Sequence, residues 1–186
     1  MKNLRILTES AITDQHGERN MTLDELLIRG AIDYTMSRYC SAIDRGAYDE
    51  LTEVFTPDAV VTFGSARPLV GPHDIVTTMT AGAEGRGSLL PQNFQRHILG
   101  KAIVNVIDGE HAKAVHYVVV ANELGPDVPG VYIDDFVKSG DRWLIERRIV
   151  NLEWTRPDSR YASAHGGPVG TPRPLLNVGF VRPIDS

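Results

Sequence analysis

Residues 22–43 read TLDELLIRGAIDYTMSRYCSAI, and this stretch decides how the rest of the chain can pack. It opens with Thr22 and Glu25 at capping-box spacing, in which a hydroxyl and a carboxylate satisfy backbone N–H groups at the start of a helix. Apolar residues then recur every three or four positions, as along one face of an α-helix: Ile28, Ile32, Met36, Tyr39 and Ile43. The pattern predicts a long amphipathic helix with one broad buried stripe.

The helix is predicted to end at Asp44-Arg45-Gly46, where the apolar pattern is interrupted. Shorter elements follow, bounded by Gly, Pro and Asp: a helix over 48–55 that stops at Thr56-Pro57-Asp58, a strand over 60–63, a helix over 75–79 and a glycine-rich loop over 82–87. The glycines of that loop do not follow a strand and open a helix, so they do not predict a phosphate-binding loop.

From residue 93 onward the apolar period changes to two, which is the period of β-strands. Short turns, among them the hairpin signal Asp108-Gly109, separate the predicted strands, which cover 93–99, 101–107, 112–123, 131–138 and 143–151. Because no helix separates them, the sheet is expected to be mostly antiparallel. The order predicts an α+β fold, a cone-shaped α+β barrel whose strongly curved sheet wraps around the long N-terminal helix and leaves an apolar pocket.

The length of 186 residues fits one domain with an extension at each end. Residues 1–20 are polar and aperiodic and predict a flexible N-terminal arm, residues 21–153 form the predicted domain, and residues 154–186 predict an extended tail rich in Pro and Gly. The open face of the sheet and the reach of this tail favour a homodimer or a homotrimer.

The net charge limits the classes of partner that the chain can bind. The chain has 19 Lys and Arg residues and 24 Asp and Glu residues, which gives a net charge of −5. An acidic chain without a basic block is poorly suited to bind a nucleic acid or an anionic membrane surface.

No segment has the pattern of a membrane helix or a signal peptide, so a cytoplasmic location is expected. No zinc or di-iron spacing is present, so no metal is predicted. The single cysteine, Cys40, cannot form an internal disulfide, and its place in the helical pattern favours a small buried hydrophobe over a nucleophile.

Two residues are candidates for acid–base chemistry at the predicted pocket. Asp44 either caps the turn after the helix or presents its carboxylate to the pocket. His97 lies on a predicted strand and is either a structural core residue or a general base that a carboxylate orients. Asp44 is that carboxylate if the end of the helix meets the strand.

Other polar residues fall on the predicted strands. His116 and Asn122 share one strand face with valines, and they either line the pocket or belong to the core. Arg147 and Arg148 point to opposite faces of the last strand. For these arginines a salt-bridged surface pair is favoured over a side chain that orients an anionic or carbonyl oxygen.

An ordered set of short segments resembles the SnoaL-like proteins of the nuclear transport factor 2-like superfamily. The set begins with YCSAIDRGAYDEL at 39–51 and continues with FTPDA at 55–59, GP at 71–72, RHILG at 96–100, DG at 108–109 and GDRWLI at 140–145. The resemblance covers about residues 22–153 and is closest to the group of scytalone dehydratase and hexachlorocyclohexane dehydrochlorinase. It implies the curved-sheet cone inferred above, with an Asp–His dyad that works in the pocket without a cofactor.

By this resemblance Asp44 and His97 correspond to the catalytic dyad. Three further residues become candidates for substrate binding, beside His116. Asn122 is the nearest match to a second pocket histidine of the dehydratase, Tyr132 stands where that enzyme has an asparagine, and Tyr39 matches a helix tyrosine that holds a substrate oxygen.

The resemblance implies a cofactor-independent lyase, with loss of water as the first candidate reaction, or an isomerase. The substrate is expected to be an apolar, cyclic small molecule. A non-catalytic ligand-binding or assembly module is the main alternative, and a polyketide cyclase or a hydrolase with the same pocket is a third, because one fold hosts many functions.

Overall fold

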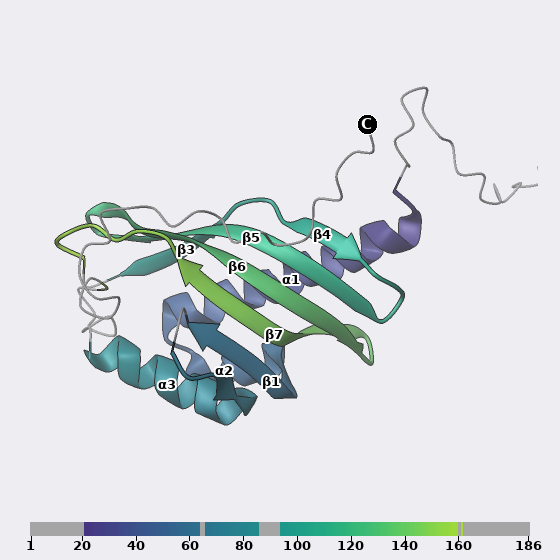
Figure 1. The fold of residues 1–186 in the computed structure, drawn as a ribbon, viewed down its shortest axis with the longest axis horizontal. Helices are drawn as coiled ribbons and strands as arrows, with labels where there is room; N and C mark the ends of the chain where they lie inside the picture. Colours follow the sequence, from purple (N-terminus) through teal and green to yellow (C-terminus); the bar gives the residue numbers. More distant parts are fainter. Residues whose placement is uncertain (1–20, 64–65, 86–93, 160, 162–186) are drawn as a thin grey trace, which may run out of the picture.

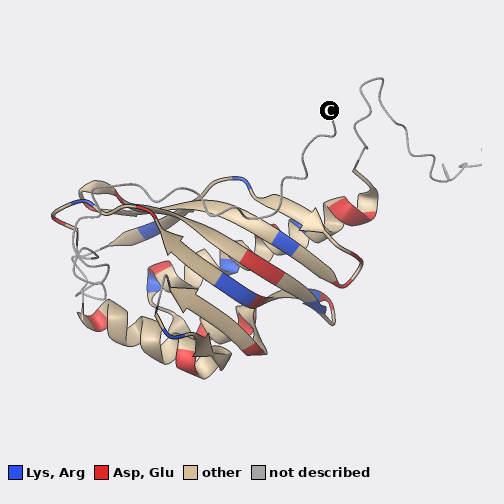
Figure 2. Ribbon diagram, viewed as in Figure 1, with Lys and Arg blue, Asp and Glu red and all other residues tan. Residues whose placement is uncertain are grey.

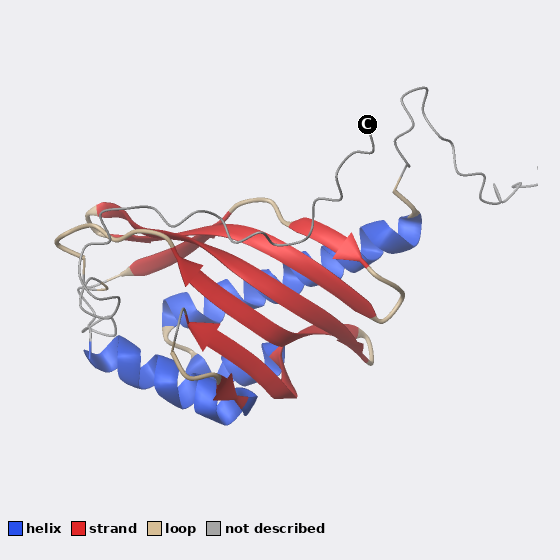
Figure 3. Cartoon of the chain, in the orientation of Figure 1, coloured by secondary structure: helices blue, strands red, loops and turns tan. Residues whose placement is uncertain are grey.

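The computed structural model describes residues 21–63, 66–85, 94–159 and 161 (Figure 1). In chain order the elements are α1 (Leu23–Arg45), α2 (Tyr48–Leu51), a 3-10 turn η1 (Thr52–Val54), β1 (Phe55–Phe63), β2 (Leu69–Val70), α3 (Gly71–Gly85), β3 (Gln95–Leu99), β4 (Ile103–Val106), β5 (His111–Asn122), β6 (Gly125–Ser139) and β7 (Arg142–Leu152). The helix α1 runs behind the sheet, and α3 lies along the end of the sheet formed by β1 and β2 (Figure 3).

The seven described strands form one sheet in the order β2-β1-β7-β6-β5-β3, and β4 also pairs with β5. Every pair is antiparallel except β1 with β7, which are parallel. The α+β fold and the mostly antiparallel sheet are therefore confirmed. The sheet does not close into a barrel, because its path ends at β2 on one side and at β3 on the other.

The helix α1 forms as its sequence predicts. The Thr22 hydroxyl accepts a hydrogen bond from the Glu25 backbone N–H at 3.2 Å, and the Glu25 carboxylate accepts one from the Thr22 N–H at 2.9 Å. The helix ends at Gly46, whose φ of 68° lies in the left-handed region that favours glycine. Its buried residues form the predicted stripe: Ile32, Thr35, Met36, Tyr39, Ala42 and Ile43.

Several elements differ from the prediction, and β2 was not predicted at all. The helix after residue 48 is shorter, because β1 already begins at Phe55 and includes Pro57. The helix α3 continues to Gly85, so most of the predicted glycine-rich loop is helical, and its last two residues lie outside the described chain. Strand β6 begins at Gly125 rather than at Val131.

Basic and acidic residues alternate across the neighbouring strands β5, β6 and β7 in Figure 2. One such pair is Lys113 with Asp135, which face each other on β5 and β6 with 3.0 Å between Nζ and Oδ1.

Cys40 is half-buried beside the core. Burial raises the pKa of its thiol to about 12, so the thiol stays protonated at neutral pH.

The predicted arm over 1–20 lies outside the described residues, as do residues 160 and 162–186 of the predicted tail over 154–186. The domain boundaries and the homodimer or homotrimer therefore stay predictions. None of the helices in the described part of the chain is long and apolar enough to cross a membrane.

Candidate active site

The structure brings Asp44 and His97 together, although they are 53 residues apart in the chain. Asp44 lies in the last turn of α1, and His97 is the central residue of β3. The distance between Asp44 Oδ1 and His97 Nδ1 is 2.6 Å, and the backbone N–H of His97 donates to both carboxylate oxygens at 3.1 Å. Only 11% of the Asp44 side chain and 5% of the His97 side chain are exposed, so water competes little for these bonds.

This geometry assigns a role to each ring nitrogen of His97. With Asp44 ionised and the imidazole neutral, Nδ1 carries the proton, and this N–H donates a hydrogen bond to the carboxylate. The other nitrogen, Nε2, then has a free lone pair, and the side chain lies in the wall of a cavity. The carboxylate is bound to His97 rather than to the turn after α1, so the capping interpretation of Asp44 does not describe this structure.

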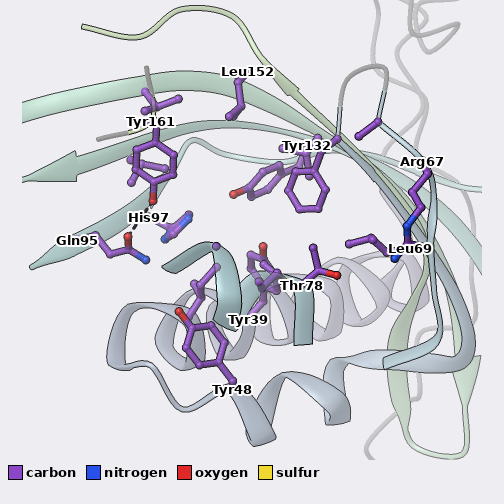
Figure 4. Close-up of a pocket in the computed structure, with 18 residues that line it drawn as sticks. Tyr39, Tyr48, Arg67, Leu69, Thr78, Gln95, His97, Tyr132, Leu152 and Tyr161 are labelled. Carbon is purple, nitrogen blue, oxygen red and sulfur yellow. Dashed lines mark hydrogen bonds between the residues drawn. The ribbon is translucent and has the colours of Figure 1, made fainter. Parts of the chain in front are cut away.

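The cavity beside His97 has a volume of about 360 Å³, within the range of small-molecule sites. It opens between α1, α3 and the strands, and its lining is mostly apolar. Four tyrosines are among the residues that line it, as Figure 4 shows: Tyr39, Tyr48, Tyr132 and Tyr161.

A buried ion pair lies beneath two of these tyrosines. The Arg148 guanidinium donates to both oxygens of Asp134, at 2.7 and 2.9 Å, and both side chains are fully buried. Its carbon atom Cζ lies 4.2 Å from the ring centre of Tyr39 and 4.5 Å from that of Tyr132, which is cation–π geometry. The favoured interpretation of Arg148 as part of a salt-bridged surface pair is therefore wrong, because the last strand turns this residue into the core.

The environment of the two tyrosines keeps their hydroxyls protonated. Burial raises the pKa of Tyr39 to about 12 and that of Tyr132 well above its usual range. The positive charge of Arg148 acts in the opposite direction on both residues but does not overcome burial. At neutral pH both phenols can therefore donate hydrogen bonds to an oxygen in the cavity.

The structure does not bring His116 and Asn122 to this cavity. His116 lines a second cavity, next to the N-terminal half of α1. The Asn122 amide donates to Asp127 Oδ2 at 2.9 Å and accepts from the Leu124 N–H at 2.9 Å, so it serves the turn between β5 and β6.

The sequence analysis did not single out several polar lining residues, among them Gln95 and Tyr161. Gln95 shares the inward face of β3 with His97, and its Oε1 accepts a hydrogen bond from the Tyr161 hydroxyl at 2.9 Å (Figure 4). Alternation along β3 could have identified Gln95 from its position two residues before His97. No local pattern identifies Tyr161, because it reaches the cavity from the segment after β7.

Acidification is expected to destabilise the fold through His116. Burial lowers the pKa of His116, nearby Arg148 adds to this effect, and Asp134 and Asp33 oppose it without reversing it. The unfolded chain therefore binds a proton at this ring more readily than the folded chain does. The free energy of unfolding decreases as the pH falls below the pKa of the histidine in the unfolded chain, about 6.5. Between pH 6.5 and 5.5 one such group can contribute at most about 1 kcal/mol to this loss.

The measurement is urea unfolding of wild type and His116→Asn at both pH values. The variant should lose less stability than wild type over this interval, by at most about 1 kcal/mol. His73→Asn, at an exposed position on α3, is the matched control and should retain the wild-type pH dependence. An unchanged pH dependence in His116→Asn would contradict the prediction.

Comparison with known proteins places these residues in a family. The model of the SnoaL-like domain matches residues 24–149. An uncharacterised protein of Mycobacterium tuberculosis is 30% identical over 139 residues, which cover 69% of this chain and 88% of that protein. A scytalone dehydratase candidate from Novosphingobium aromaticivorans has a TM-score of 0.63 at 22% identity, over 73% of this chain and 91% of that one. LinA has a TM-score of 0.59 at 16% identity, over 83% of this chain and 95% of that one.

The two solved structures share the fold, and the family model spans both the helix that carries Asp44 and the strand that carries His97. On this match the chain belongs to the SnoaL-like domain family.

Proposed function

We propose that the protein is a cofactor-independent lyase or isomerase in which His97 removes a proton from an apolar, cyclic small molecule. The observation that carries this proposal is the 2.6 Å contact between Asp44 Oδ1 and His97 Nδ1 at the wall of an apolar cavity. A SnoaL-like domain fits a protein that processes a small molecule.

The first step is general-base catalysis. Nε2 of His97 takes a proton from a carbon next to a carbonyl group, and Asp44 stabilises the imidazolium that forms. The electron pair of the broken C–H bond moves toward the carbonyl oxygen. Because the hydroxyls of Tyr39 and Tyr132 stay protonated, they can donate hydrogen bonds to that oxygen as its charge grows.

Dehydration is the net reaction that we favour. In the second step the carbon–carbon double bond forms, the bond to a β-hydroxyl group breaks, and the imidazolium returns its proton to the departing oxygen. Water is released and His97 is regenerated neutral. In an isomerase the same proton would return to a different carbon.

The lining sets the class of substrate. Most of the residues around the cavity are apolar, and they come from both helices and strands: Ile43, Phe63, Leu69, Met79, Val120, Val128, Val150 and Leu152. The cation among the lining residues that the structure describes, Arg67, pairs with Asp74 at 2.9 Å. A neutral molecule with one or two oxygens therefore fits better than a charged one.

The Asp44→Asn variant tests the dyad. Asparagine can no longer stabilise the imidazolium by charge, so we expect turnover to fall by a factor on the order of 10–100 while the fold is retained. The assay is a panel of alicyclic and benzo-fused β-hydroxy ketones, with enone formation followed by ultraviolet absorbance. Asp49→Asn, at an exposed position in α2, is the matched control and should keep wild-type turnover.

Two outcomes would contradict the proposal. Asp44→Asn with wild-type turnover would show that the dyad does not act in the reaction. Binding of the panel compounds without turnover and without exchange of carbon-bound protons with solvent deuterium would instead support a non-catalytic ligand-binding module.

A further inference from the structure

A second cavity lies between α1 and the turn that joins β3 to β4. Its volume is about 470 Å³, and it shares no lining residue with the cavity beside His97. Arg29 reaches it from α1, Lys101 from the turn and His116 from β5. It is therefore a separate site, and the proposed reaction does not use it.

Two polar groups at this cavity have no hydrogen-bond partner among the residues that the structure describes. One is the imidazole of His116, which is 1% exposed and has both ring nitrogens unbonded. The distance from His116 Nδ1 to Oδ2 of its neighbour Asp134 is 3.7 Å, which is beyond hydrogen-bond distance. The other is the Nε atom of Arg29, which is also buried. Buried polar groups are nearly always hydrogen-bonded, so two such groups at one cavity indicate a missing partner.

The chemistry of these groups identifies the partner as an acceptor. A guanidinium nitrogen only donates, and a neutral imidazole carries one N–H. Two cations, Arg29 and Lys101, face one carboxylate, Asp33, among the lining residues. The excess of one positive charge matches one negative charge on a ligand, which favours a carboxylate over a more highly charged phosphate.

The remainder of the lining can hold an organic body. Met36, Leu99 and Val104 contribute apolar side chains to the cavity. From this arrangement we propose that the second cavity binds a small organic carboxylate, whose oxygens accept hydrogen bonds from Arg29 Nε–H and from the His116 ring.

Benzoate and benzamide test the proposal on the full chain, because they have the same shape and differ in charge. The readout is the NMR signals of the histidine rings and of the arginine Nε–H groups. Benzoate should shift the His116 and Arg29 signals saturably, whereas benzamide should not. Arg29→Gln should weaken benzoate binding about tenfold, the loss of one charge-assisted hydrogen bond.

The control variant is Arg38→Gln on the same helix, because Arg38 pairs with Glu53 at 2.6 Å and does not line this cavity. It should bind benzoate as wild type does. Lys101→Gln, at an exposed position, supplies a second variant that should weaken binding if Arg29→Gln fails to fold.

Three results would overturn the proposal. The first is a linear, unsaturable response to benzoate, and the second is an equal response to benzamide. The third is a benzoate response at the His97 ring in place of the His116 ring, which would place the carboxylate in the first cavity.

Discussion

The His97→Gln variant is expected to lose turnover by a factor on the order of 10²–10⁴, the usual contribution of a positioned general base. Glutamine can occupy the space of the imidazole, but its amide cannot take a proton from carbon. The backbone N–H of His97, which donates to Asp44 at 3.1 Å, is kept in the variant, so the contact between β3 and α1 should persist.

Two readouts measure this loss. The first is enone formation from the panel compound that wild type turns over fastest, and the second is the exchange of its carbon-bound proton with solvent deuterium. Both should fall together, because both require proton abstraction by His97. His111→Gln, at a half-exposed position, is the matched control. If His97→Gln still exchanged the proton at the wild-type rate, another group would have to be the base.

The Arg148→Met variant is expected to lose about 3–5 kcal/mol of unfolding free energy, because it leaves the Asp134 carboxylate buried without its partner. Both side chains of this pair are fully buried, and two hydrogen bonds at 2.7 and 2.9 Å join them. The variant also removes the cation beneath the rings of Tyr39 and Tyr132.

The double variant Arg148→Met with Asp134→Leu separates the contribution of the ion pair to stability from that of side-chain packing. Replacing a buried ion pair by apolar side chains of similar size is often neutral, so the double variant should recover most of the lost stability. Urea unfolding of the two single variants and the double variant gives the coupling energy. A double variant that loses as much stability as the two single variants together would show that the pair does not act as a unit. Arg147→Met, at an exposed position on the same strand, should change stability little.

The helix α1 shows what local sequence specifies well. The Thr22–Glu25 capping box and the left-handed Gly46 each depend on residues within one helical turn. The apolar stripe depends on apolar residues that recur every three or four positions, and this spacing can be seen within the helix segment alone. Such signals do not need the remainder of the fold, so the predicted helix and the observed helix agree closely.

Strands β1 and β6 show where local signals mislead. Pro57 was predicted to lie between a helix and a strand, yet β1 contains it, because the register of β1 with β7 shifts between Phe55 and Val60 and tolerates a residue without an N–H. The start of β6 contains Pro126 and Pro129, which are accommodated because β7 pairs only as far as Gly130. Pairing partners, rather than the residues themselves, decide such boundaries.

The sequence also indicated part of the candidate site. The resemblance to SnoaL-like proteins pointed to Asp44 and His97, and the structure puts them in hydrogen-bond contact. It also suggested Tyr39 and Tyr132, which line the cavity. Their catalytic and binding roles stay predictions that the variants above test.

The sequence by itself determined the long N-terminal helix, the change to a strand period and the α+β class, because these follow from the residue types of short segments. Only the tertiary structure decided that Arg148 is buried under two tyrosines and that His116 lines a cavity of its own. The physical reason is that burial and electrostatic surroundings depend on which strands become neighbours. That order is set by packing across the whole sheet, and no single segment encodes it.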